Sequence, residues 1–401
     1  MDSKTRTKQI LIVTLTAVTL GVLGFFLYRF FAPATPTPGG VAPTSIFGRL
    51  PVIGGRIGPT PVPEGEVMPG GGIPAPSPEA VTRRSIQLTD EAVVGPAFDA
   101  KRQKILYYKK GDGHLVSNSV GGGNEETISN LTILNILEVL WSPDMKKTII
   151  LYQDGGTIKK FITDATSTPK VAFLPQESTT PAWSPDGKSI WWLAKQAEIY
   201  TLISADINGK NQKKLDLTTP MPELKLSVIA PDLALLVPKT ASFFETPLFL
   251  FSLKTAGLNP VLTGFGLLAA SDPNPKTQNI VYTRTSRVGT LDDLHLLDFK
   301  SGKDTSWPLK TLATKCAFSR GSKLLFCAVP KNPPARDLPE AWQKGKVSFT
   351  DAIYRIDLAT SKAEEIFHEG GDVISLIVSD DAKKLFFIDK TTGFLYGLSL
   401  E

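Results

Sequence analysis

Trp183-Ser184-Pro185-Asp186-Gly187-Lys188, followed by Ser189-Ile190-Trp191-Trp192-Leu193, is the stretch of this 401-residue sequence that decides its fold. Ser, Pro and Gly stand where a type I β-turn prefers them, and Pro presets the backbone angle φ. The short apolar run that follows is typical of a buried β-strand. A second copy covers residues 141–151, with Met145 in place of the glycine. These two stretches predict hairpins.

Weaker copies of this hairpin keep the same frame. The seven copies begin at Phe98, Trp141, Trp183, Ile229, Ala270, Phe318 and Val378. The first five steps average about 44 residues, and the last step is longer. A period of 40–50 residues, each with four short strands, is the signature of a β-propeller. The sequence therefore predicts an all-β, seven-bladed β-propeller over residues 85–401.

The ends of the repeat array predict how the ring closes. The last repeat has room for three strands only, at Val373–Val378, Lys384–Asp389 and Phe394–Leu400. The segment Arg84–Thr89 precedes the first copy and has no partner of its own. It can supply the missing fourth strand, which would remove two exposed sheet edges.

The Trp-Ser-Pro-Asp-Gly-Lys phrase resembles the repeat of bacterial TolB-like propellers and of the propeller beside the hydrolase in dipeptidyl-peptidase-type enzymes. The TolB resemblance implies a periplasmic binding platform for protein partners. This chain differs in having an N-terminal apolar segment and no recognisable separate N-terminal domain. No hydrolase-sized domain is left over, so the second resemblance implies a propeller without peptidase activity.

The N-terminal region predicts a membrane anchor. Residues 9–28 carry no charge and are long enough, as a helix, to span a bilayer core of roughly 30 Å. Lys4, Arg6 and Lys8 precede this stretch, which places the N-terminus in the cytoplasm by the positive-inside rule. We expect a cytoplasmic tail (1–8), a transmembrane helix (9–31) inserted in the lipid bilayer, and an extracytoplasmic remainder. The alternative is a cleaved signal peptide, with Ala32-Pro33-Ala34 as a loose cleavage site.

Residues 32–84 predict a flexible linker. Twelve prolines and several glycine pairs fall between residues 33 and 84, and such a composition does not sustain helices or sheets. As a coil, this linker would reach about 40 Å. Residues 45–53 are more apolar than their surroundings, which leaves open a short docking segment within an otherwise irregular linker.

Charge and motif content exclude several functions. Residues 1–84 hold eight basic and four acidic side chains, which leaves 36 and 35 in the rest of the chain. A nearly neutral folded part without a Lys/Arg run is not a nucleic-acid binder. Three histidines and two cysteines form no zinc motif, and no nucleotide-binding or serine-hydrolase motif occurs. We therefore expect no metal, no cofactor and no catalytic residue.

Recurring residues of the hairpins have structural interpretations. Asp144, Asp186 and Asp232 are expected to cap backbone N–H groups within their turns. Trp141 and Trp183 are expected to pack between blades. Pairing of Phe318 with Leu325 would place Cys316 opposite Cys327, within reach of a cross-strand disulfide. Two buried thiols are the alternative.

Loop length distinguishes the later repeats from the earlier ones. The loops between second and third strands lie on one face of a propeller, and they lengthen at 239–247, 285–293 and 330–350. A mixture of aromatic and charged side chains there is typical of recognition surfaces, although a passive insertion would also be tolerated. The candidate binding residues are Phe243, Phe244, Arg287, Arg336, Asp337, Glu340, Trp342 and Lys346.

Three functions remain open from the sequence. The first is a membrane-anchored scaffold of the cell envelope that binds a protein or peptide without catalysis. The second is a hydrolase that processes glycans or peptides, with carboxyl groups drawn from Asp292, Asp293, Asp337 and Glu340. The third is a sensor that binds a small ligand in the central channel.

Overall fold

The structure is a computed structural model, and it describes residues 83–196, 199–217 and 224–401. The predicted membrane helix (9–31) and nearly all of the predicted linker (32–84) lie outside these residues. In the three described ranges, no helix is both long enough and apolar enough to cross a bilayer. The described chain is nearly all β-strand, with one short helix, α3 (Glu340–Gln343), and one 3-10 turn, η1 (Ala313–Lys315).

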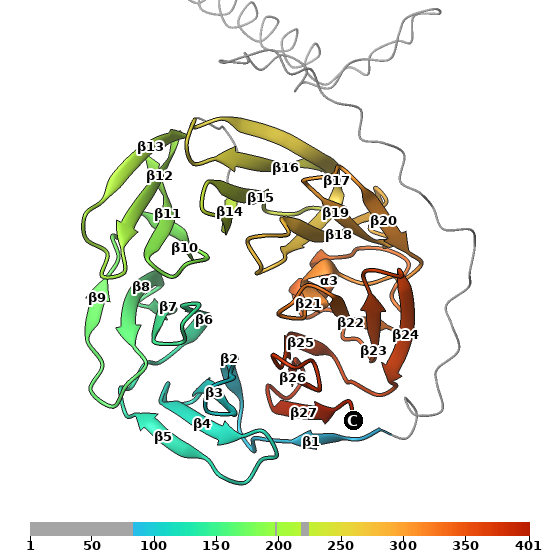
Figure 1. The fold of residues 1–401 in the computed structure, drawn as a ribbon, viewed down its shortest axis with the longest axis horizontal. Coiled ribbons are helices and arrows are strands. Elements are labelled where there is room, and N and C mark those ends of the chain that lie inside the picture. The colour runs from blue at the N-terminus through green and yellow to red at the C-terminus, as the bar shows by residue number, and fades with distance from the viewer. Residues whose placement is uncertain (1–82, 197–198, 218–223) are drawn as a thin grey trace, which may run out of the picture. The chain divides into compact units, whose positions relative to one another are not determined.

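The strands form six sheets, which follow one another around a ring (Figure 1). Three four-stranded sheets come first: β2 (Val93–Asp99), β3 (Lys104–Lys109), β4 (Leu115–Ser119) and β5 (Glu126–Ser129); β6 (Ile136–Trp141), β7 (Lys147–Asp154), β8 (Thr157–Asp164) and β9 (Val171–Phe173); β10 (Ser178–Trp183), β11 (Ser189–Gln196), β12 (Ile199–Asp206) and β13 (Lys213–Leu217). A seven-stranded sheet follows: β14 (Leu224–Ala230), β15 (Leu233–Pro238), β16 (Glu245–Ser252), β17 (Leu258–Ser271), β18 (Asn279–Thr285), β19 (Leu294–Asp298) and β20 (Asp304–Trp307). The last two are β21 (Cys316–Phe318), β22 (Leu324–Pro330), β23 (Asp351–Asp357) and β24 (Lys362–Phe367), then β25 (Val373–Val378), β26 (Lys384–Asp389), β27 (Leu395–Ser399) and β1 (Ser85–Gln87).

The predicted turn chemistry is confirmed for Asp186 and Asp144. It is wrong for Asp232, whose carboxylate instead accepts from the Lys254 ammonium at 2.8 Å across the strand ends. The Oδ1 atom of Asp186 accepts from the Lys188 backbone N–H at 3.1 Å and from the Ser184 hydroxyl at 2.6 Å. Asp144 makes the equivalent pair of bonds. The indole N–H of Trp183 donates to the Leu140 carbonyl of the preceding sheet at 2.8 Å, as expected of an aromatic that packs between blades. These turns therefore connect strands and also join neighbouring sheets.

Met145 carries a cost that the neighbouring repeat avoids. Its φ of 62° matches the φ of 67° at Gly187, the equivalent residue of the ideal copy. The left-handed conformation costs an L-residue about 1–2 kcal/mol. Glycine avoids this cost, but it loses about 0.5–1 kcal/mol more in conformational entropy on folding, because its unfolded chain is freer. We expect Met145→Gly to raise the free energy of unfolding in urea by roughly 0.5–1 kcal/mol. Gly187→Met should lower it, and a loss of stability in Met145→Gly would contradict this account.

The core lies between the sheets. One hydrophobic cluster joins Ile105 and Tyr107 of β3 to Phe386 and Ile388 of β26, in the next sheet around the ring. Another joins Ile149 of β7 to residues of β11 and β12. The inner strands are apolar on both sides because each sheet is covered by a neighbour on either side.

The predicted closure of the ring is confirmed. Strand β1 pairs antiparallel with β27, with Ile86 opposite Gly397 and Gln87 opposite Tyr396. The Leu88 N–H extends the pairing by donating to the Leu395 carbonyl at 2.8 Å. The first strand of the described chain thus completes the sheet of the last three (Figure 1).

The fourth and fifth repeats differ from the expectation of separate four-stranded sheets. They share β17, which pairs with β16 along its first part and with β18 along its second. The register shifts between Phe265 and Leu268 at Gly266, whose φ is +53°. A Cβ at Gly266 would lie 2.2 Å from Oγ1 of Thr285, so only glycine fits. A glycine bulge, rather than a loop, makes the transition here.

Cys316 faces Cys327 across the β21–β22 hairpin, and a disulfide joins them. Of the two alternatives left open by the sequence, the structure has the bridge. It closes a short loop, because the two residues are 11 positions apart. We expect Cys316→Ser/Cys327→Ser to lower the free energy of unfolding by about 2–3 kcal/mol. A reductant should lower the free energy of unfolding of the native chain by a similar amount and leave that of the double variant unchanged. If the reductant does not change the stability of the native chain, the bridge is contradicted.

Candidate binding face

Three long loops lie at the same end of their sheets, opposite the end that carries the Pro-Asp turns. They are the loops β15–β16 (239–244), β18–β19 (286–293) and β22–β23 (331–350). Because all three are second-to-third-strand connections of antiparallel sheets, they share this end. The first two belong to the seven-stranded sheet, and the third belongs to the sheet that follows it around the ring (Figure 1). We call their combined surface the loop face.

The three loops contact one another directly. The Asp337 N–H donates to the Val288 carbonyl at 2.9 Å, and the Leu338 N–H donates to the Gly289 carbonyl at 3.1 Å. Across the other boundary, Oε1 of Glu340 accepts from the Ser242 backbone N–H at 2.6 Å and from its hydroxyl at 3.2 Å. The long 331–350 loop is thus bonded to both of its neighbours.

Gly289 permits the contact between the second and third loops. Its φ is +82°, and a Cβ there would lie 2.5 Å from the Asp337 nitrogen. Any other residue would push the two backbones apart and break the hydrogen bonds that join them. The sequence showed this glycine but not the close approach of another loop.

A buried charge cluster lies between the 331–350 loop and the sheets and holds the loop in place. Lys315, at the end of η1, has a fully buried side chain whose Nζ lies 2.8 Å from both Oδ2 of Asp351 and Oδ1 of Asp372. Its ammonium also lies 4.7 Å from the ring centre of Trp342 and 5.0 Å from that of Phe349. Both aromatic residues belong to the loop, so the loop covers the ion pairs and excludes water from them.

The two carboxyl groups of this cluster have opposite pKa shifts. Burial raises the pKa of Asp351 to about 6, although the Lys315 ammonium works against it. Burial would also raise the pKa of Asp372, but Lys315 and the Trp342 indole N–H outweigh it and hold that pKa below its ordinary value. Burial lowers the pKa of Lys390, whose ammonium lies 4.1 Å from the Trp342 ring centre.

Two of the candidate binding residues turn out to hold the loop face together. Trp342, expected to be a surface anchor, is only 9% exposed. Its indole N–H donates to both carboxylate oxygens of Asp372, at 2.9 and 3.0 Å, and its ring stacks on Phe349. Glu340 also bonds within the face, because its carboxylate accepts a hydrogen bond from the Ser242 backbone N–H. Both residues are drawn inward because the long loop has its own small core over Lys315.

The remaining candidates are exposed on the loop face. Phe243 and Phe244 are 64% and 71% exposed, and Val288 of the neighbouring loop is 53% exposed. Arg287 is exposed, and its guanidinium stacks over the Phe265 ring at 5.2 Å. The other exposed candidates are Arg336, Asp337 and Lys346. The face therefore combines adjacent aromatic rings with a surplus of positive charge.

The carboxyl groups considered for hydrolysis are mostly engaged elsewhere. Asp293 forms an ion pair with Lys310 at 2.6 Å, and Asp292 lies 3.9 Å from the Arg284 guanidinium. Glu340 is bonded to Ser242, and Asp337 is exposed. Each of the first three already serves a local contact, whereas a glycosidase needs two carboxyl groups that face one bond of the substrate.

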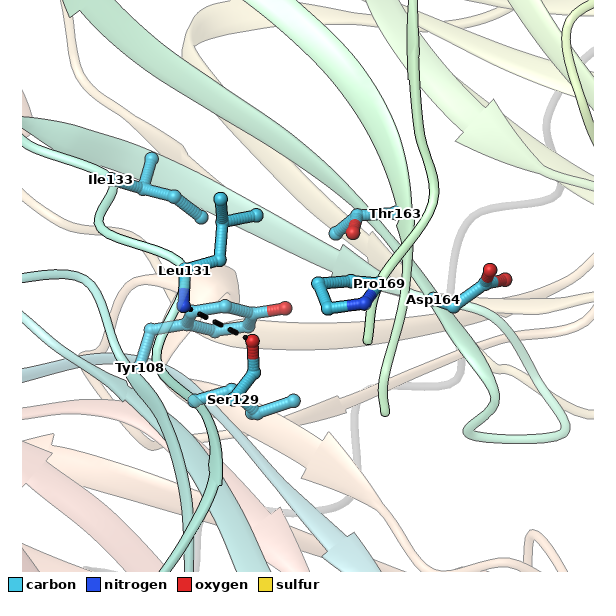
Figure 2. A pocket seen from close by; sticks show the side chains of 8 residues that line it. Tyr108, Ser129, Leu131, Ile133, Thr163, Asp164 and Pro169 are labelled. Carbon is cyan, nitrogen blue, oxygen red and sulfur yellow. Dashed lines mark hydrogen bonds between the residues drawn. The ribbon is translucent and has the colours of Figure 1, made fainter. Parts of the chain in front are cut away.

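Two cavities lie away from the loop face. A cavity of about 10 Å³, about the room that one water molecule needs, lies between Tyr108, Ser129, Leu131, Thr163 and Pro169. Figure 2 shows these lining side chains. A cleft of about 610 Å³ lies at the Pro-Asp end, between Asp298, Lys303, Lys323 and Asp357. Within the part of the chain that the structure describes, no three His, Cys, Asp or Glu side chains gather as metal ligands.

Comparison with known proteins gives the fold. No protein-family model matches this sequence, and no curated protein sequence matches it. Among solved structures, the chain is similar to an oligogalacturonate lyase in complex with manganese, with 12% identity and a TM-score of 0.59 over 80% of this chain and 94% of that one. An oligogalacturonate lyase from Vibrio parahaemolyticus gives 9% identity and a TM-score of 0.57, with 79% and 93% covered. A putative TolB from Agrobacterium tumefaciens gives 17% identity and a TM-score of 0.41, with 56% and 84% covered. At such identities the likeness to the two lyases concerns the fold alone, and that fold is the β-propeller.

Proposed function

We propose that this chain is a membrane-anchored, extracytoplasmic β-propeller that binds a protein or peptide partner on its loop face and performs no chemistry of its own. We further propose that the ring has seven blades, in which the shared strand β17 is the outer strand of the fourth and the inner strand of the fifth. The apolar, uncharged residues 9–28 support the anchor. The Cys316–Cys327 bridge supports an oxidising compartment.

The observation that carries this proposal is the exposed aromatic pair Phe243–Phe244. It lies on a loop face whose loops are held in place by hydrogen bonds to the 331–350 loop. Two adjacent rings more than half exposed offer apolar area, and hot spots of interfaces are enriched in aromatic residues and arginine. Arg336 and Lys346 make no ion pair with another described residue. A peptide with apolar side chains and acidic groups therefore fits this surface best.

The test is cross-linking in cells that make the full-length protein, followed by mass spectrometry. We expect Phe243→Ser/Phe244→Ser to weaken partner binding at least about 30-fold, because hot-spot aromatics contribute 2 kcal/mol or more. The matched control is Val171→Ser/Phe173→Ser, which removes another exposed apolar pair, 41% and 67% exposed, on the outer strand β9.

The outcomes separate the alternatives. Loss of the cross-linked partner in the first variant only supports the loop face as the binding surface. Unchanged cross-links in that variant, or equal losses in both, would reject it. Arg336→Ala/Lys346→Ala should reduce partner binding more at low salt than at high salt. The reason is that salt screens the attraction between these exposed charges and an acidic partner.

A further inference from the structure

Asp351 stands where the 331–350 loop rejoins the sheet. It is the first residue of β23 and is fully buried. Its Oδ2 atom accepts from the Val373 N–H at 2.7 Å and from Lys315 at 2.8 Å. Its Oδ1 atom is buried and accepts no hydrogen bond within the described residues. A carboxylate oxygen that lacks a donor in a dry site is where a proton binds most readily.

The loop covers the ammonium to which Asp351 is bonded. Phe349, two residues before it, is 6% exposed, and this ring and Trp342 cover the Lys315 ammonium to which Asp351 is bonded. If the loop lifts, water reaches the carboxyl group, and the desolvation penalty of its charged form is removed. The closed loop therefore favours the neutral form of Asp351, and the lifted loop favours the charged form.

We propose that protonation of Asp351 tightens the 331–350 loop onto the propeller, so that mildly acidic conditions hold the loop face in its closed form. The effect on a partner rests on the proposed function, but the tightening of the loop does not. Asp351 is thus a positioning residue that acts through Lys315 and the loop.

The direction follows from linkage. The pKa of Asp351 is about 6 in the closed form and returns toward the ordinary aspartate value of 3.8 when the loop lifts. Between these values the closed form binds more protons, so lowering the pH favours it. From pH 7.5 to pH 5 this single group shifts the ratio of closed to lifted loop by about tenfold.

Other charged groups around Asp351 do not reproduce this change. Lys315 faces it from η1, and Asp372, before β25, has its pKa lowered by Lys315 and by the Trp342 indole N–H. Asp389 and Lys390, where β26 ends, lie around Gly371 and Trp342. His368, just after β24, is hydrogen-bonded to Glu365, and His368→Gln serves as the control variant.

Hydrogen exchange of the full-length protein tests the proposal. Protection of peptides from residues 331–349, corrected for intrinsic exchange rates, is measured from pH 4.5 to 8, with peptides of β11 as the internal reference. We expect protection of the loop to rise about tenfold between pH 7.5 and pH 5, with most of that rise below pH 6. Asp351→Asn should be equally protected at both pH values, and His368→Gln should retain the tenfold change.

Loop protection that stays constant or falls on acidification would overturn the proposal, as would a tenfold change that persists in Asp351→Asn or disappears in His368→Gln. If Asp351→Asn does not fold, the pH at which protection begins to rise in the native chain and in His368→Gln still decides, because protection that does not rise above pH 5 rejects the proposal. No partner is needed for this measurement, so it can fail or succeed independently of the cross-linking test.

Discussion

Replacing Lys315 by Met is expected to lower the free energy of unfolding at pH 7.5 by about 3–5 kcal/mol. Met has a similar length and keeps the packing against Trp342 and Phe349, so the change removes mainly the charge. Asp351 and Asp372 would then lie buried without the ammonium that bonds to both of them. Breaking a buried ion pair from one side costs far more than the pair contributes, because the remaining charges stay desolvated.

Urea unfolding and thermal unfolding check this expectation. At roughly 2 °C per kcal/mol for a domain of this size, the melting temperature should fall by about 5–10 °C. Lys344→Met, an exposed lysine of the same loop, should change stability by no more than about 0.5 kcal/mol. The triple variant Lys315→Met/Asp351→Asn/Asp372→Asn should recover most of the loss, since it leaves no buried charge.

The pH dependence of the Lys315→Met defect has a definite sign. Without the ammonium, the pKa values of both carboxyl groups rise in the folded state, so the fold binds more protons than the unfolded chain. Stability then falls as the pH rises, and the deficit should be larger at pH 7.5 than at pH 5. A variant within 1 kcal/mol of the native protein at pH 7.5 would show that the cluster does not hold the loop.

Local turn chemistry made much of the ring predictable from the sequence. The Ser-Pro-Asp-Gly phrase fixes a tight hairpin by itself, so strands such as β11 follow from nearby residues. The pairing of Cys316 with Cys327 followed from the weaker copy that begins at Phe318, once it was aligned on the same frame. Closure by residues 84–89 followed from counting strands, because a three-stranded last repeat leaves an edge that another segment must cover. The shared strand β17 was missed because a glycine bulge leaves no turn signal in the sequence.

The candidate site was predictable only in outline. Loop length marked the three loops of the loop face, but which side chains point outward depends on contacts between distant segments. Trp342 is the clearest case: a tryptophan among charges looks like a surface anchor until Asp372, 30 residues later, accepts its indole N–H. Lys315 gave no signal, since neither Asp351 nor Asp372 lies near it in the sequence and only the fold brings them together.

Loss of the closing strand is expected to have the other large effect. The change Ser85→Gly/Ile86→Ser/Gln87→Gly/Leu88→Ser in the full chain should lower the free energy of unfolding by about 4–6 kcal/mol. Leu88 is 6% exposed and packs between β27 and β3, so its truncation costs about 2–5 kcal/mol alone. Weakened pairing with β27 adds about 0.5–1.5 kcal/mol for each hydrogen bond lost.

Ile86→Ser is the matched control, because this side chain is 55% exposed and its loss should cost no more than about 0.5 kcal/mol. Urea unfolding measures both variants, and hydrogen exchange of residues 395–399 reports whether β27 has become a free edge. If the ring depends on its closing strand, exchange should rise in β27 and in the facing β3 while β11, across the ring, unfolds only with the whole domain. Equal stability of the fourfold variant and Ile86→Ser would mean that the sheets hold the ring through their stacked faces alone.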